Sequence, residues 1–304
     1  MKVLIVGSSG FIGRHLLNHL ASTGIDVCGV SSSDGKGIEA HTGALSEQFS
    51  IPPGTDTIFY LAQSPYYRQV PEMASHLLNV NVVSAVKVAD MARRFNVNRF
   101  IYTSTGNVYA SSFKPLSEDA PLRRDNWYSL SKIHAEETLS LFRNDLNITI
   151  VRLFGVYGPG QTDKIIPKLL NSVAQGVPIF LERNLTDPDD LGGLKLSTIF
   201  IKDILEILTK LICISGTPYL NIAGDEVVSI RQIAEMMGII LEKYVKIETV
   251  DKYRSFDLIA DIELLRKTLN PNFTPFEIGI QETIRYALNE FSNLSAKKNL
   301  TILN

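Results

Sequence analysis

The chain has 304 residues, of which 45% are hydrophobic and 20% charged, a composition typical of a globular protein that buries a large core. The formal net charge of −2, with Lys and Arg scattered along the chain, argues against a nucleic-acid partner and against binding to an anionic membrane. The two cysteines are far apart, the N-terminal run MKVLIVG is too short for a signal peptide, and no apolar stretch reaches the ~20 residues that span a bilayer, so we expect a soluble cytoplasmic protein.

Strands and helices alternate regularly in the first half of the chain. Short apolar runs predict strands, and segments with helical spacing of apolar residues predict helices. In chain order the predicted strands are 3–6, 27–30, 38–43, 57–61, 99–103 and 148–153, and the predicted helices are 11–23, 71–95 and 128–141. This alternation predicts an α/β fold with a doubly wound parallel sheet, in which ligands bind outside the carboxyl ends of the strands.

The pattern changes after residue 155. Helices are predicted at 165–175, 203–214 and 277–290, a strand at 195–201, and a polar loop at 182–194. We therefore expect a dinucleotide-binding domain at 1–154 that also receives later segments at about 195–215. A smaller mixed α/β lobe at 155–290 would bind the substrate, and residues 291–304 would form a loosely held tail.

Three glycines follow the first strand in the sequence GSSGFIG, residues 7–13. Gly7 would allow a tight turn, Gly10 a close approach of the backbone to a pyrophosphate, and Gly13 close packing of helix on strand. The helix that follows offers free N–H groups and a positive dipole end to an anion. The glycines, placed between a strand and a helix, predict a Rossmann-type dinucleotide site.

The end of the second predicted strand bears on the choice between NAD and NADP. An acidic residue normally stands there to accept the ribose hydroxyls of NAD, but this chain has Ser31 and Ser32, with Asp34 three residues late. The missing charge removes repulsion of a 2′-phosphate, whereas Asp34 could still reach back to a ribose. NADP is slightly favoured over NAD.

Tyr128 and Lys132 lie four residues apart on one face of a predicted helix. A neutral phenol is no counter-ion for an ammonium, so an ion pair does not explain the arrangement. A nearby cation favours the ionised form of a phenol and lowers its pKa from roughly 10 toward neutrality. The pair therefore indicates proton-transfer chemistry.

Five motifs occur in a fixed order along nearly the whole chain: the glycine turn, IFYLAQ (58–63), YTSTGNVYA (102–110), the Tyr128/Lys132 pair and RLFGVYGPG (152–160). In this order they resemble the extended short-chain dehydrogenase/reductase family, in its NAD-dependent epimerase/dehydratase branch. The resemblance implies that Tyr128 is the catalytic acid/base. It further implies that Lys132 lowers the pKa of Tyr128 and holds the nicotinamide ribose, and that Thr105 hydrogen-bonds the substrate oxygen. Hydride transfer at a carbinol carbon needs such a proton relay.

The resemblance also implies a set of binding residues. The residues expected to bind cofactor are Gly7, Gly10, Phe11, Ile12, Gly13, Ser31, Ser32, Leu61, Ala62, Asn81, Tyr128 and Lys132; those expected to bind substrate are Gln63, Lys195, Gly106 and Asn107. Lys195 stands for an arginine that often clasps the substrate diphosphate in the family. The chain departs from the family pattern at Ala44, where an aspartate commonly faces adenine, and at Gly155, where many relatives have asparagine.

Gly106 and Asn107 occupy the positions at which sugar dehydratases of this family carry Asp-Glu. Neither residue can act as acid or base, so dehydration is disfavoured. We expect a nucleotide-sugar epimerase or a keto-sugar reductase dependent on NAD or NADP. Two alternatives remain open: a ketone reductase of a non-sugar small molecule, and a non-catalytic dinucleotide-binding sensor.

The five histidines show no metal-ligand spacing with cysteines or acids, so no metal site is expected. Glu136, one turn beyond Lys132, is expected to form at most a weak i,i+4 pair with it. In the family, the helices matching 71–95 and 128–141 commonly pair across a two-fold axis. Their apolar residues permit a homodimer here.

Overall fold

The structure, a computed structural model, describes the backbone of residues 1–301 and the side chains of residues 1–290. A six-stranded sheet forms its centre, in the order β10-β5-β4-β3-β1-β2. The strands are β1 (Lys2–Val6), β2 (Asp26–Val30), β3 (Thr55–Tyr60), β4 (Arg99–Thr105), β5 (Asn147–Leu153) and β10 (Tyr219–Ile222). All neighbours in it pair in parallel, which confirms the predicted α/β doubly wound fold.

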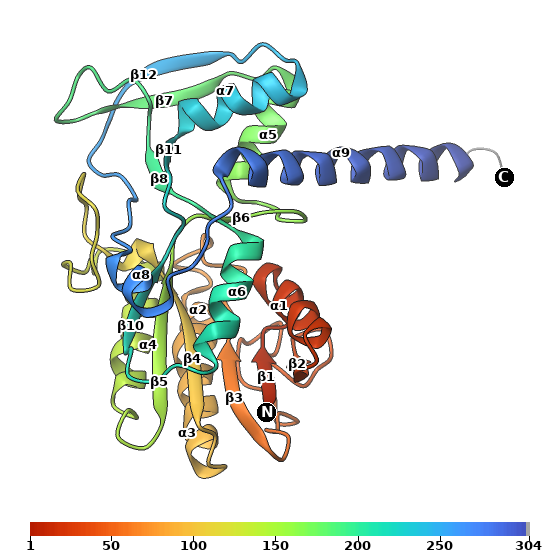
Figure 1. The fold of residues 1–304 in the computed structure, drawn as a ribbon, viewed down its shortest axis with the longest axis vertical. Coiled ribbons are helices and arrows are strands. Elements are labelled where there is room, and N and C mark those ends of the chain that lie inside the picture. The colour runs from red at the N-terminus through yellow and green to blue at the C-terminus, as the bar shows by residue number, and fades with distance from the viewer. Residues whose placement is uncertain (302–304) are drawn as a thin grey trace.

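Helices cover both faces of the sheet, as a parallel sheet requires (Figure 1). They are α1 (Phe11–Ser22), α2 (Ala74–Leu78), the π-helical segment η1 (Asn79–Ser84), α3 (Ala85–Arg94), α4 (Trp127–Ser140) and α6 (Ile201–Leu211). Alternate residues of each strand enter opposite cores: Val3 and Ile5 pack in the cluster that includes α1 and α6, and Leu4 and Val6 in the cluster that includes α3 and α4.

The predicted strand at 38–43 is wrong. Its backbone turns back on itself, because Glu39 N–H donates to Ala44 O at 2.8 Å and Gly43 N–H donates to Glu39 O at 3.0 Å. Gly43 has a φ of +69°, which ends any extended run. A single antiparallel bridge between Ile38 and Leu45 remains. The sixth strand of the sheet is instead β10, which the first half of the sequence could not reveal.

The remaining elements form a smaller mixed α/β group, which we call the C-terminal lobe. It contains β6 (Val156–Tyr157), α5 (Ile165–Gln175), β7 (Ile179–Asn184), β8 (Lys195–Ser197), β9 (Ile199–Phe200), β11 (Val227–Ser229), α7 (Ile230–Leu241), β12 (Ile247–Arg254) and α9 (Phe276–Thr301). Helix α8 (Glu263–Leu269) packs instead against β10 of the central sheet. Three two-stranded sheets join β11 to β8, β12 to β7 and β6 to β9.

Helix α9 projects from the body of the protein (Figure 1). Its backbone continues past the predicted end at residue 290 as far as Thr301. Residues 302–304 of the predicted tail, and the side chains of the whole tail, lie outside the described residues. Within the described chain, no helix combines the length and the hydropathy that crossing a bilayer demands.

Candidate active site

The glycine turn connects β1 to α1 and is shaped by contacts that exclude side chains. Gly7 has a φ of +93°, and a Cβ built on it would lie 2.7 Å from the backbone nitrogen of Ala62. A Cβ on Gly13 would collide with the carbonyl oxygen of Gly7. Gly10 is different: a Cβ there would meet only Gly7 O, at 3.3 Å. Gly7 and Gly13 are thus required by packing, whereas Gly10 borders open space.

The N-terminus of α1 has the properties of a phosphate cradle. Gly10 is its N-cap, no side chain caps it, and its first turn contains no acidic residue. Its free N–H groups therefore remain available to an anion. The guanidinium of Arg14 donates to the carbonyl oxygen of Gly160, which joins the turn to the loop before α5. A dinucleotide pyrophosphate fits this turn, because Gly10 has no side chain to occupy the space beside it.

A cavity of about 1070 Å³ lies at the carboxyl ends of the parallel strands. Most of the predicted site residues line it: Gly7, Gly10, Phe11, Ile12, Gly13, Ser31, Ser32, Leu61, Ala62, Gln63, Thr105, Asn107 and Tyr128. Lys132, Asn81, Gly106 and Lys195 do not. One cavity therefore joins the glycine turn to Thr105 and Tyr128, as the switch point of a doubly wound sheet should.

Thr105, at the end of β4, is oriented as a hydrogen-bond donor. Its Oγ1 accepts the backbone N–H of Asn107 at 3.2 Å and the Nδ2 of the same residue at 3.1 Å. A hydroxyl oxygen has two lone pairs, and both are occupied, so Thr105 can offer only its proton to a further partner. The carbonyl of Asn107 is held in turn by the hydroxyl of Ser129, at 2.7 Å.

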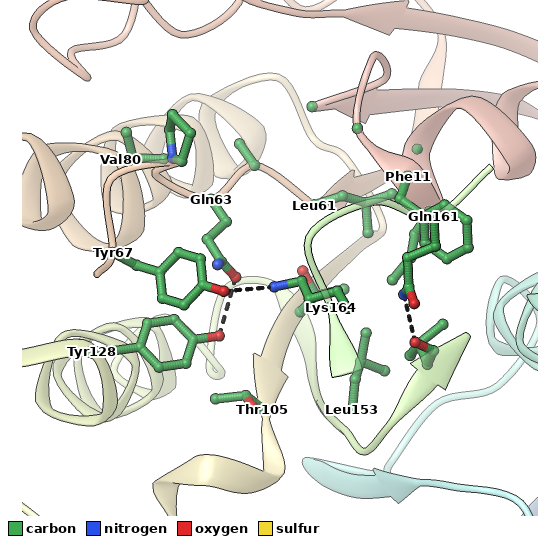
Figure 2. Close-up of a pocket in the computed structure, with 18 of the residues that line it drawn as sticks. Phe11, Leu61, Gln63, Tyr67, Val80, Thr105, Tyr128, Leu153, Gln161 and Lys164 are labelled. Atoms are coloured by element: carbon green, nitrogen blue, oxygen red, sulfur yellow. Dashed lines mark hydrogen bonds between the residues drawn. The ribbon is translucent and has the colours of Figure 1, made fainter. Parts of the chain in front are cut away.

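Tyr128 is placed at the start of α4 by Asn126, whose side chain caps the helix by accepting the N–H of Ser129 at 2.9 Å. Its hydroxyl donates to Oε1 of Gln63 at 3.1 Å (Figure 2). Gln63 follows β3 closely in sequence, so strand and helix ends from different parts of the chain meet here. The proton of the phenol already lies on a hydrogen bond inside the cavity.

The predicted lowering of the Tyr128 pKa is wrong for this arrangement. Burial raises the pKa of Tyr128 to about 12, an effect that a hydrogen bond with Thr105 opposes and the neighbouring Tyr67 reinforces. Lys132 does not counter it, because its ammonium is turned to the carbonyl oxygen of Thr103, at 2.9 Å. The phenol is therefore protonated at neutral pH.

Lys132 is 2% exposed and lies 4.8 Å from the ring centroid of Tyr102. Burial lowers its pKa to about 7, and the charge of Glu136 opposes that fall. Lys132 is thus behind the cavity wall, beneath the end of β4. Its protonated and neutral forms therefore coexist near neutral pH, because the pKa of Lys132 is about 7.

Glu136 forms an ion pair with Arg152, beyond the weak i,i+4 pair with Lys132 that the sequence suggested. It is 2% exposed and forms a salt bridge with Arg152 of β5, with 2.7 Å between Glu136 Oε2 and Arg152 Nη2. The hydroxyl of Ser104, next to Thr105, also donates to Glu136. Arg152 reaches on to the hydroxyl of Tyr109 at 2.9 Å. This buried network ties α4 to β4 and β5 directly behind Thr105 and Lys132.

Tyr67 and Lys164 were not singled out from the sequence, and they lie beside Tyr128. The ring of Tyr67 lies 5.2 Å from that of Tyr128, and its hydroxyl accepts a hydrogen bond from Nζ of Lys164 at 3.0 Å (Figure 2). Arg68 and Asp163 form an ion pair at 3.0 Å beside them. The motif SPYYR at 64–68, directly after the third strand of the sheet, was the signal in the sequence.

The other predicted residues are placed away from the cavity surface. Asn81 is fully buried, with Nδ2 donating to Ser131 Oγ at 2.9 Å and Oδ1 without a partner. Gly106 is a packing position, since a Cβ there would lie 2.6 Å from the ring of Phe154.

In the cavity itself, Oε1 of Gln161 is buried and unpaired, although its Nε2 donates to Val156 O at 2.6 Å.

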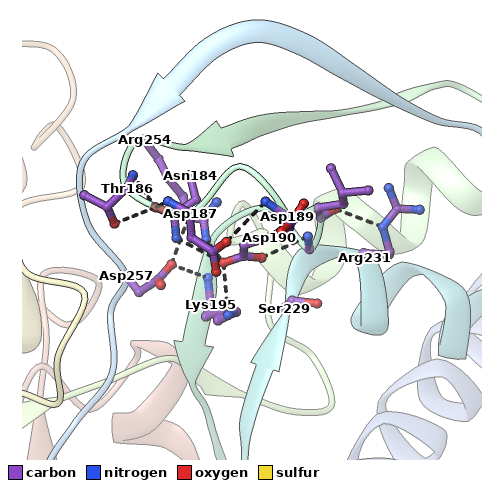
Figure 3. Close-up of polar contacts among 12 residues, drawn as sticks. Asn184, Thr186, Asp187, Asp189, Asp190, Lys195, Ser229, Arg231, Arg254 and Asp257 are labelled. Atoms are coloured by element: carbon purple, nitrogen blue, oxygen red, sulfur yellow. Dashed lines mark hydrogen bonds and ion pairs between the residues drawn. The ribbon is translucent and has the colours of Figure 1, made fainter.

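Lys195 belongs to a charge network in the C-terminal lobe (Figure 3). Its Nζ lies 3.0 Å from Oδ2 of Asp190, which also pairs with the buried Arg254 at 2.5 Å. Arg254 pairs in addition with Asp257, at 3.0 Å. Burial alone would raise the pKa of Asp190, but hydrogen bonds from Lys195, Asn184 and its other partners hold it well below its usual range. Two cations and two carboxylates thus balance within the network.

The end of the cavity beside β2 holds Ser31 and, behind it, Asp34. Oδ2 of Asp34 accepts the backbone N–H of Ser31 at 3.0 Å and its hydroxyl at 3.3 Å. Oδ1 accepts the N–H of Lys36 at 2.8 Å. The late acidic residue is therefore folded back against the end of β2.

Comparison with known proteins agrees with this geometry. Residues 3–208 match the NAD dependent epimerase/dehydratase family. A dTDP-4-dehydro-6-deoxy-D-allose reductase of Streptomyces is 25% identical, over 93% of this chain and 95% of the reductase.

Solved structures share the fold. A UDP-glucose 4-epimerase of Thermotoga maritima with UDP-glucose has a TM-score of 0.79 at 19% identity, covering 96% of this chain and 100% of the epimerase. A UDP-glucuronic acid 4-epimerase of Bacillus cereus with UDP-glucuronic acid and NAD has a TM-score of 0.76 at 22% identity, covering 94% and 98%. With the family match over most of its length, the chain is an enzyme of the NAD-dependent epimerase/dehydratase family.

Proposed function

We propose that the protein is a nucleotide-sugar epimerase or keto-sugar reductase that uses Thr105 and Tyr128 for proton transfer. The observation that carries this proposal is the single cavity in which the glycine turn, the Thr105 hydroxyl and the Tyr128 phenol meet. Relatives named as a dTDP-sugar reductase and as UDP-sugar epimerases support the substrate class. Gly106 and Asn107 supply no acid or base, which speaks against dehydration.

The two hydroxyls divide the work at the substrate oxygen. Thr105 donates a hydrogen bond without ionising, because both of its lone pairs are held by Asn107. Tyr128, protonated at neutral pH, gives its proton to the alkoxide that forms when a ketone is reduced, and accepts one in the reverse direction. When bound, a nicotinamide supplies and accepts the hydride.

For the cofactor we propose NAD, in place of the slight preference for NADP that the sequence suggested. The carboxylate of Asp34 is fixed beside Ser31, which lines the cavity. The oxygens of Asp34 already accept hydrogen bonds from Ser31 and Lys36, but its negative charge at that place repels a 2′-phosphate. Gly7, Gly10 and Gly13 would hold the pyrophosphate.

The domain division at residue 154, with the segment near 195–215 returning to the first domain, is part of the same proposal. Helix α1 packs against α6 (Ile201–Leu211), which supports that return. The C-terminal lobe would bind the nucleotide, and the faces of α3 and α4 would form a homodimer. We place the enzyme in the cytoplasm.

Mass spectrometry of the dinucleotide that co-purifies with the native protein tests the proposal, together with a conversion assay. Retained NAD and interconversion of two nucleotide sugars without added cofactor would identify an epimerase. A requirement for added reduced cofactor and a keto-sugar nucleotide would identify a reductase. Failure to bind any dinucleotide, or to convert any nucleotide sugar in either assay, would contradict it.

A further inference from the structure

The charged groups that line the cavity are unequally paired. The lining contains four cations, Arg14, Arg68, Arg123 and Lys164, and one acid, Glu39. Arg68 and Arg123 form ion pairs with Asp163 and Asp125, at 3.0 and 2.8 Å. Arg14 donates to the backbone of Gly160 beside the glycine turn. Lys164 forms no ion pair with any of the residues that the structure describes.

Lys164 is held at the reaction centre by an aromatic residue. Its ammonium lies 3.0 Å from the Tyr67 hydroxyl and 4.7 Å from the centroid of the Tyr67 ring. That ring packs on Tyr128 (Figure 2). An ammonium has three donors, and Tyr67 takes one of them, so the others are available to a ligand. Arg68 also lies over the Tyr67 ring, at 5.0 Å, but its charge is paired with Asp163.

An anion that forms an ion pair with the ammonium of Lys164 must lie close to the reacting carbon of the substrate. The substrate oxygen that reacts lies at Tyr128 and Thr105, and the Tyr67 ring separates Tyr128 from Lys164 by the width of one side chain. In a nucleotide sugar the diphosphate is attached to the anomeric carbon, across the ring from the carbon at position 4. A carboxylate on the carbon next to the reacting carbinol is therefore closer to the reacting carbon than the diphosphate is.

From these contacts we infer that Lys164, positioned by Tyr67, binds a sugar carboxylate next to the reacting carbinol, so that the substrate is a nucleotide-linked uronic acid. This inference rests on the proposed function and narrows its substrate class. Hydrogen bonds to charged groups are worth about 1.5–3 kcal/mol, which corresponds to a preference of about 10- to 100-fold over a neutral hexose.

Titration calorimetry with the full chain and NAD tests the inference. The ligands are UDP-glucuronic acid and UDP-glucose, and in parallel the two dTDP-linked sugars. The wild-type protein should bind one of the uronic acids at least about 10-fold more tightly than its matched hexose. Lys164→Met should abolish that preference while leaving the affinity for the hexose within about 3-fold. Lys164→Arg should retain the preference, and Tyr67→Phe should reduce it.

Lys168→Met is the matched control. Lys168 is an exposed lysine in the first turn of α5, the helix that follows Lys164. It pairs with Asp163 at 3.0 Å and is absent from the cavity lining, so its removal should leave the preference unchanged. Equal affinity of the wild-type protein for acid and hexose would overturn the inference. So would an equal loss of both ligands in Lys164→Met, since this would assign Lys164 to the diphosphate. Binding of NAD with none of the nucleotide sugars would instead remove the proposed function, and the inference with it.

Discussion

The hydroxyl of Tyr128 donates to Oε1 of Gln63 at 3.1 Å, although 65 residues separate the two in sequence. The acceptor fixes the phenol in the cavity with its proton in place. Burial then keeps it protonated, with a pKa of about 12. Tyr128 is therefore ready to donate a proton. Whether it can also accept one depends on the charges around it.

Tyr128→Phe should abolish turnover, because it removes the phenol that is proposed to transfer a proton to the substrate oxygen. Binding of NAD should remain within about 3-fold of wild type, since the phenyl ring retains its packing on Tyr67. Rates of product formation and fluorescence titration with NADH measure the two effects. Full activity in this variant would remove the mechanism. Tyr253→Phe, an exposed phenol on β12 outside the cavity lining, serves as the control and should keep turnover.

Substitutions at two glycines of the turn should have different consequences. Gly10→Val should weaken NAD binding at least about 10-fold with little loss of stability, because its Cβ faces open space beside the cradle. Gly13→Val should destabilise the fold itself, since its Cβ would collide with the Gly7 carbonyl. Dissociation constants and melting temperatures separate the outcomes. Unchanged affinity in Gly10→Val would contradict the cradle.

The buried Lys132 should make stability depend on pH. Its pKa falls to about 7 on folding from a usual value of 10.5, so between these values the unfolded chain binds more protons than the folded one. The free energy of unfolding should therefore rise by about 2 kcal/mol from pH 7 to pH 9 through this group, and fall again as the pH is lowered.

Denaturant unfolding of wild type and Lys132→Met at the two pH values measures this term. The difference in stability between the two proteins should shift by about 2 kcal/mol in favour of wild type at the higher pH. Lys87→Met, an exposed lysine on α3, should show no such shift. The same result for both variants would show that Lys132 is not penalised by burial.

Asp190→Asn should destabilise the C-terminal lobe at neutral pH, by about 3 kcal/mol, because it leaves the buried Arg254 with one carboxylate in place of two. The lowered pKa of Asp190 gives a stabilisation that is present above its ordinary value of 3.8 and is lost as the pH falls through the folded pKa. The variant and wild type should therefore converge in stability toward strongly acidic pH. Asp187→Asn, in the same loop, is the control, and an equal loss there would argue against the network.

The alternation of strands and helices, the glycine turn and the placement of Tyr128 and Lys132 on one helix could all be predicted from the sequence. These features depend on residues that are close together in the sequence, so the spacing of apolar residues and the positions of glycines are enough to predict them. The same local reasoning failed at 38–43, because apolar content did not reveal that Gly43 would take a φ of +69° and close a turn.

The contacts between side chains from distant parts of the sequence could be found only in the folded structure. Glu136 lies one turn from Lys132 in sequence yet pairs with Arg152 on another strand. Lys132 faces the Thr103 carbonyl, so its charge does not lower the pKa of Tyr128. Lys164 reaches Tyr67 across 97 residues of sequence. Such contacts depend on which distant segments the fold brings to one cavity and on how much water it removes there, and neither quantity can be computed from neighbours along the chain.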